Sequence, residues 1–151
     1  MIIEGAHYQV HYDEVAPQAV QTDDGWRGID IRFLIGSAVT GTHDMTLWRA
    51  TFLPDARHAR HTHAVGEAFF VISGRGAAGT GDREYEVTAG SALYVPPNTV
   101  HWFRNLDDTE PVQIVGVYAP AGSLEESGYD FVGEITDEHR TVGRDGTGKQ
   151  G

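Results

Sequence analysis

Hydrophobic and polar residues alternate along much of this chain with a period of two, which is typical of β-strands. The clearest case is Ile29, Ile31, Phe33 and Ile35, which occupy every second position. This spacing places the four side chains on one face of a strand. That apolar face needs a second sheet to cover it.

Other stretches predict further strands at residues 46–53, 69–72, 76–80, 84–88, 112–118 and 129–135, with an edge strand at 6–13. The strand at 46–53 is expected to end at Pro54-Asp55, because this dipeptide favours a turn. The run at 69–72 is apolar throughout and predicts a strand buried on both faces. Residues 17–25 are expected to form a loop, and 123–126 have the spacing of a capping box that starts one helical turn.

Many short strands, glycine-rich turns and the lack of a long helical pattern predict an all-β sandwich or barrel. With 151 residues and no internal repeat, the chain predicts a single domain over residues 1–142. Residues 143–151 are expected to be a flexible tail.

A candidate metal site follows the second long strand. His61 and His63 are two positions apart, so in a strand both imidazoles point the same way, with Cα atoms about 7 Å apart. Glu67 follows across a bend of small residues and brings a carboxylate toward the same point. Mixed nitrogen and oxygen ligands suit Zn, Fe, Mn, Ni or Cu better than Ca or Mg.

A second stretch, residues 90–105, supplies a fourth candidate ligand, His101. Together the two stretches resemble the cupin superfamily, whose motifs read G(X)5HXH(X)3–4E(X)6G and G(X)5PXG(X)2H(X)3N. The residues that match these motifs are His61, His63, Glu67 and Gly74 in the first, and Gly90, Pro96, His101 and Asn105 in the second.

Two positions depart from the motifs, since Asp55 and Asn98 stand where the family has glycine. Asp and Asn are the residues other than glycine that best tolerate left-handed backbone, so both departures leave the ligands untouched. The resemblance covers about residues 45–119. It implies a double-stranded β-helix, or jelly-roll barrel, that holds one divalent transition metal, with Fe(II) first and Mn, Ni, Cu or Zn as alternatives. It also implies a homodimer and a structural role for Asn105.

His58 precedes the ligand pair by three residues and has two interpretations. It is either a catalytic acid, base or substrate contact at the mouth of the barrel, beside Glu67 as the other catalytic candidate, or a solvated loop residue. The remaining histidines have no informative spacing and are expected to be surface or capping residues; they are His7, His11, His43 and His139.

Aromatic residues give the only indication of a substrate pocket. Phe69 and Phe103 lie two positions after Glu67 and His101, so in regular strands they point toward the metal. Trp48 and Tyr118 are further candidates, and each of the four is also a plausible core residue. A divalent ion with three neutral imidazoles and one carboxylate carries a net charge of about +1, which favours an anionic or enolisable oxygen ligand.

Composition restricts the partners. The formal net charge of -11 argues against nucleic acid and anionic membranes, and the lack of cysteine excludes disulfides and thiol chemistry. The first residues have neither the basic start nor the apolar core of a signal peptide, so a cytoplasmic location is expected.

A homodimer is expected to pair through a strand at residues 7–12.

Three function classes agree with these features. The first is a dioxygenase that acts on a small enolisable or aromatic oxygen-bearing substrate. The second is a redox-inert lyase, isomerase or polyketide cyclase that uses the metal as a Lewis acid. The third is a cupin that binds a small molecule without catalysis.

Overall fold

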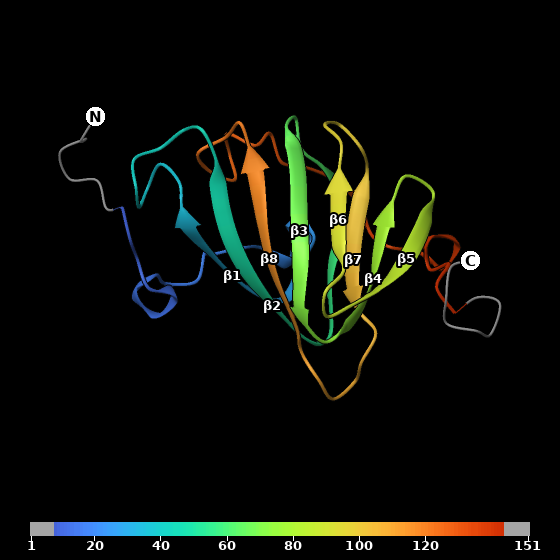
Figure 1. Ribbon diagram of the computed structural model, residues 1–151. Coiled ribbons are helices and arrows are strands. Elements are labelled where there is room, and N and C mark those ends of the chain that lie inside the picture. Colours follow the sequence, from blue (N-terminus) through green and yellow to red (C-terminus); the bar gives the residue numbers. More distant parts are fainter. Residues whose placement is uncertain (1–7, 144–151) are drawn as a thin grey trace.

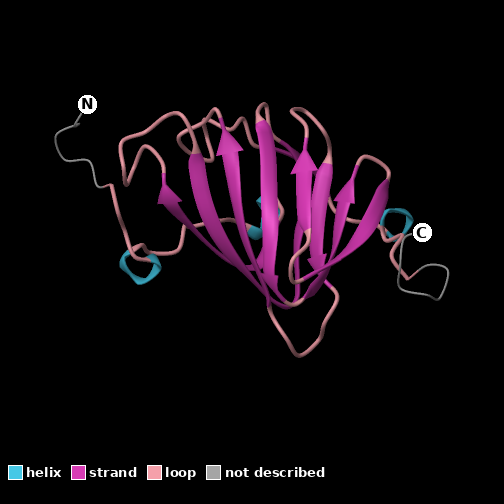
Figure 2. Cartoon of the chain, in the orientation of Figure 1, coloured by secondary structure: helices cyan, strands magenta, loops and turns pink. Residues whose placement is uncertain are grey.

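The computed structural model describes residues 8–143, which form nine strands and three short 3-10 helices (Figures 1 and 2). The strands are β1 (Trp26–Ile35), β2 (Thr46–Thr62), β3 (Gly66–Ser73), β4 (Arg75–Thr80), β5 (Arg83–Thr88), β6 (Ala92–Val95), β7 (His101–Asn105), β8 (Val112–Ala119) and β9 (Asp130–Gly133). The helices are η1 (Tyr12–Glu14), η2 (Thr22–Asp24) and η3 (Asp137–His139). The strands pair antiparallel in a nearly closed barrel, so the prediction of an all-β jelly roll is confirmed.

The long strand β2 joins the two halves of the barrel. Its first half, Thr46 to Phe52, pairs with β8, and its second half pairs with β7 and β9. The full order is β5-β4-β7-β2-β8-β3-β6, with β1 also paired to β2. Figure 1 shows β1, β2, β8 and β3 side by side, with β7, β4 and β5 continuing on the other side.

The prediction that the strand from residue 46 ends at Pro54-Asp55 is wrong. The strand continues to Thr62, and the dipeptide instead forms a corner where the neighbour of β2 changes from β8 to β7. Asp55 has a φ of 65° there, the left-handed conformation inferred from its place in the motif. Asn98, the other departure from the motif, has a φ of 62°.

Asn105 fastens this corner. Its Nδ2 donates to the carbonyl oxygens of Phe52, Leu53 and Glu110 at 2.9–3.2 Å, and its Oδ1 accepts from the Asp107 amide at 2.8 Å. These bonds satisfy backbone groups that the bend removes from the strand ladder. Asn105 is therefore structural, as the resemblance implies.

Two other local predictions need correction. Phe70 and Ile72 are 47% and 42% exposed, so β3 is buried on one face and not on both. Residues 8–11 form no strand, and the turn η1 follows them; positions 6 and 7 lie outside the described residues. The single helical turn expected from residue 123 does form, because the Ser127 amide donates to the Ser123 carbonyl oxygen at 3.0 Å and the Glu126 amide donates to the Ser123 hydroxyl at 3.0 Å.

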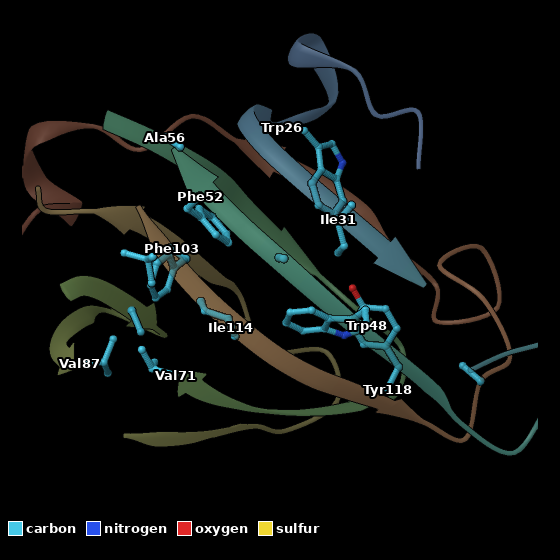
Figure 3. Packing of buried hydrophobic residues seen from close by; sticks show 14 residues of the cluster. Trp26, Ile31, Trp48, Phe52, Ala56, Val71, Val87, Phe103, Ile114 and Tyr118 are labelled. Atoms are coloured by element: carbon cyan, nitrogen blue, oxygen red, sulfur yellow. The ribbon is translucent and has the colours of Figure 1, made fainter. Parts of the chain in front are cut away.

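Large aromatic and aliphatic side chains pack together in the core of the barrel (Figure 3). Glycines lie against two of the buried indoles. A Cβ on Gly116 of β8 would stand 2.2 Å from the Trp48 ring, and one on Gly79 of β4 would stand 1.8 Å from the Trp102 ring. Each glycine thus makes room for an indole. Among residues 8–143, no helix is long and apolar enough to cross a membrane.

Candidate metal centre

Three buried histidines from two paired strands meet inside the barrel. His61 lies at the end of β2 and His63 directly follows that strand, and His101 begins β7 directly opposite His61 in the strand register. Their exposed fractions are only 2–5%. One ligand atom from each ring lies within 4.8 Å of the others, so the three histidines can hold a metal ion.

Hydrogen bonds fix which ring nitrogen of each histidine faces the centre. The Nδ1 of His61 lies 2.6 Å from the Ala59 carbonyl oxygen, and the Nδ1 of His101 lies 2.9 Å from that of Thr99. A carbonyl oxygen only accepts, so both Nδ1 atoms carry the proton. Both Nε2 atoms are therefore left with a lone pair for a metal.

The third ring is fixed by Ser127. The Ser127 hydroxyl donates its hydrogen to the Leu124 carbonyl oxygen at 2.5 Å, so it accepts from Nδ1 of His63 at 2.9 Å. This leaves a lone pair on Nε2 of His63 as well. The Nε2 atoms of His63 and His101 are buried and lack a hydrogen-bond partner within residues 8–143, as expected of atoms placed to bind an ion.

Glu67 on β3 stands beside this group of three. Its Oε1 lies 2.8 Å from Nε2 of His101. Two ligands of one ion at right angles lie about 3.0 Å apart when each bond is about 2.1 Å. The contact thus fits a carboxylate and an imidazole that share one metal.

Burial controls the charge of these groups. Burial and the neighbouring histidines hold the pKa of His61 well below its ordinary value, and burial lowers the pKa of His63 to about 4. Burial also lowers the pKa of His101, but the Glu67 carboxylate more than offsets this and the net shift is upward. The first two rings are therefore neutral at pH 7, the form in which imidazole binds metals.

His58 is a buried strand residue and not a solvated loop residue. It is 8% exposed, and its ring is stacked between Trp26 at 3.8 Å and His61 at 3.7 Å. Tyr129 donates its hydroxyl hydrogen to the Asp24 carbonyl oxygen at 2.5 Å, so it accepts from Nε2 of His58 at 3.1 Å. His58 therefore has the opposite tautomer to the three candidate ligands, and it supports the ring of His61 from behind.

A small cavity of about 40 Å³ adjoins the histidines. Trp48, Phe69 and Phe103 line it, together with His61, Glu67 and other side chains. Tyr118 does not line this cavity; its ring packs 4.6 Å from the ring of His63.

The remaining described histidines lie away from the centre. His11 caps η1 by accepting from the Asp13 amide, and His43 contacts Glu126 at the surface. His139 accepts from the Thr136 amide at the start of η3. These three confirm the expectation of surface or capping residues, whereas His7 lies outside the described residues.

The sequence interpretation missed Ser127, Tyr129 and Trp26. Ser127 is 64 positions from His63, and Tyr129 is 71 positions from His58. Neither belongs to a motif, and no periodic pattern connects them to the ligands. Their only signal is that the segment after β8 contains polar and aromatic residues in a turn-rich stretch.

A family model described as the cupin domain matches residues 48–118. This range contains all four candidate ligands, and the structure has the same fold as solved cupin-like proteins. The chain belongs to the cupin superfamily.

Known proteins resemble this cupin at modest sequence identity. An uncharacterised protein of Streptomyces coelicolor is 36% identical over 61 residues, which are 40% of this chain and 56% of that relative. This cupin thus spans little more than half the length of that curated relative. The polyketide cyclase RemF from Streptomyces resistomycificus has a TM-score of 0.70 and 19% identity, over 87% of this chain and 89% of RemF. A predicted oxalate decarboxylase from Thermotoga maritima has a TM-score of 0.64 and 17% identity, over 74% and 97% of the two chains. At these identities the solved structures establish the fold alone.

Proposed function

We propose that this cupin is a metal-dependent dioxygenase that acts on a small enolisable substrate. The metal ligands in this proposal are His61, His63, Glu67 and His101. The observation that carries it is the arrangement of the three rings, each with Nδ1 committed to an acceptor and Nε2 turned inward. Inward-facing ring nitrogens without a hydrogen-bond partner are unusual in an apolar core, because buried polar atoms are normally paired.

The donor set favours a transition metal. Three imidazoles and a carboxylate suit Fe, Mn, Ni, Cu or Zn, and Fe(II) is our first choice among them. Fe(II) would supply the one-electron chemistry with O2 that no side chain of this protein provides. The protein's own part is to hold the ligands rigid, through Ala59, Thr99 and Ser127, and to exclude water by aromatic walls.

The cavity size restricts the substrate. A volume of about 40 Å³ compares with 10–15 Å³ for one enclosed water and several hundred for a drug-sized ligand. A small enolisable acid or diketone is therefore favoured over a hydroxylated aromatic ring. Glu67 is the carboxylate on the cavity wall and is our candidate for accepting the substrate's acidic proton.

A redox-inert reaction is the second candidate. The solved structures of similar fold include proteins named polyketide cyclase and oxalate decarboxylase, and neither name requires an oxidation. The small volume of the cavity suits a small carboxylic acid better than a polyketide, so within this class a lyase is favoured.

The test combines metal content with oxygen uptake. Protein purified without added metal should contain about one equivalent of Fe, Mn, Ni or Cu, and an oxygen electrode should record uptake that depends on a small enolisable acid or diketone. His63→Ala should abolish both the metal and the uptake. His11→Ala is the matched control, because that histidine is exposed and its hydrogen bonds stay within η1, and it should retain both. Turnover that continues without O2, or with Zn in place of the native ion, would refute the dioxygenase and favour the lyase, because a d10 ion has no redox chemistry.

A further inference from the structure

One residue that lines the cavity, Trp48, carries a hydrogen-bond donor without an acceptor among the described residues. Trp48 is 5% exposed, and its buried Nε1 has no hydrogen-bond partner within the part of the chain that the structure describes. Trp102 differs, since its Nε1 donates to Glu84 Oε2 at 2.9 Å. Buried N–H groups are nearly always paired, so the unpaired indole of Trp48 requires an explanation.

The indole is also held firmly near the candidate ligands. Gly116 of β8 lies against its ring, at a position where a Cβ would come within 2.2 Å of the indole. The Trp48 ring centre is also 5.9 Å from that of Tyr118 (Figure 3), and the Tyr118 ring centre lies 4.6 Å from that of His63. The indole donor is therefore held in place, with only the Tyr118 ring between it and the candidate ligand His63. A donor that is already fixed orients a ligand at little cost in entropy.

The charges around the cavity restrict what this donor binds. Among residues 8–143, no lysine or arginine lines the cavity, and its ionisable lining residues are Glu67 and three histidines. A divalent ion with one carboxylate and neutral imidazoles has a net charge of about +1. A monoanion cancels this charge, whereas a dianion leaves an uncompensated negative charge in an apolar space.

We infer that Trp48 Nε1–H donates a hydrogen bond to an oxygen of a small monoanion, a monocarboxylate or an enolate, bound in this cavity. This inference rests on the metal centre of the proposed function and adds the substrate class. The competing explanation is that the N–H points at the face of Tyr118, a weak contact that would need no ligand.

The test uses the zinc-loaded protein and acetate as the probe, because Zn is d10 and does not disturb NMR signals. The three indole N–H signals are assigned with single Trp→Phe variants, since the chain has three tryptophans. Acetate is added at constant ionic strength, and its binding is followed independently by the signal of a 13C label. We expect the Trp48 indole proton to move downfield as acetate binds, while that of Trp102 stays in place because Glu84 already accepts from it.

Replacement of the donor should weaken acetate binding about tenfold or more, because hydrogen bonds to charged groups are the stronger ones. Trp48→Phe removes the N–H, and 3-benzothienylalanine at the same position keeps the bicyclic ring while sulfur replaces the N–H. The second replacement decides the matter if the first variant does not fold. Acetamide, the neutral analogue, and sulfate, a dianion, should both fail to displace acetate.

Zinc content is measured before acetate is added, so the two proposals fail in different ways. Zinc uptake and acetate binding with a stationary Trp48 signal, or with full affinity in the benzothienyl protein, would overturn the role of Trp48 and leave the metal centre intact. Displacement of acetate by sulfate would overturn the preference for a monoanion. Protein that takes up no zinc, or no other transition metal, would overturn both proposals.

Discussion

Glu84→Gln should destabilise the fold strongly, although it changes only one atom of a residue away from the candidate metal. Glu84 is fully buried. One carboxylate oxygen accepts from Nε of Arg104 at 2.8 Å and from Nε1 of Trp102 at 2.9 Å. The other accepts from Nη2 of Arg104 at 2.8 Å and from the Val142 amide at 3.1 Å. The carboxylate thereby joins β5, β7 and the C-terminal segment.

The magnitude follows from the number of acceptors. Glutamine keeps one oxygen and presents an NH2 group to the other two donors, so two charge-assisted bonds are lost at about 1.5–3 kcal/mol each. The guanidinium of Arg104 also loses its buried counter-charge, a change that costs about 3–5 kcal/mol in comparable pairs. These contributions overlap, and we expect a loss of about 3–5 kcal/mol in the free energy of unfolding.

The assay is urea unfolding of chelator-treated protein, followed by tryptophan fluorescence at pH 7 and again at acid pH. Burial alone would raise the pKa of Glu84, but the bonds from Arg104 and Trp102 lower it below its ordinary value. A lowered folded-state pKa contributes stability above the unfolded pKa, and this contribution is lost as the pH falls through the folded value. The difference between wild type and Glu84→Gln should therefore shrink on acidification.

Glu86→Gln is the matched control, because Glu86 lies two residues further along β5 and pairs with the half-exposed Arg75 at 2.9 Å. A pair of this kind contributes at most about 1 kcal/mol. Equal losses for the two variants would refute the reasoning. So would a Glu84→Gln loss that stays constant from pH 7 to acid.

Three further predictions concern the barrel and its centre. Gly116→Ala should cost about 1–3 kcal/mol or more, seen as a lower Tm, because its Cβ would overlap the Trp48 ring; an unchanged Tm would contradict this. Ser127→Ala should weaken metal binding about 10–100-fold in a chelator competition with little change in Tm, and Ser127→Thr should restore it if the hydroxyl positions the ligand ring. His101→Ala should release metal more readily than Glu67→Ala in the same competition, because imidazole contributes more affinity for late divalent metals; the reverse order would contradict the assigned ligand strengths.

The sequence predicted the inward face of single strands well and the relation between strands less well. Ile31 is 2% exposed on the predicted face of β1, because a period of two reports directly which side chains share a face. The apolar run at Phe70 and Ile72 was misread, because an exposed apolar face and a buried one have the same composition. Pro54 was read as an end, because local turn chemistry does not tell a corner within a strand from its termination.

For the candidate site too, the residues that are close in the sequence were predicted and those that are distant were missed. The spacing of His61, His63 and Glu67 is local, so strand geometry and motif together were enough to predict their proximity. Ser127 and Tyr129 arrive from a segment after the last long strand, and only the closed barrel shows which side chains that segment contacts. Side chains that support ligands are chosen by tertiary packing, which leaves no spacing rule in the chain.

The corner in β2 is what turns two separate motifs into one centre. Before the corner, β2 pairs with β8, and after it the same strand pairs with β7, which places His101 opposite His61. A strand that ended at Pro54, as the turn signal suggested, would have no regular partner register at His61 and no reason to face His101. Asp55 makes the change of direction, and Asn105 satisfies the backbone groups that the corner leaves without partners. Asn105 is the last residue of the motif that contains His101, and both lie on β7. One strand therefore carries the residue that stabilises the bend and the ligand that the bend positions.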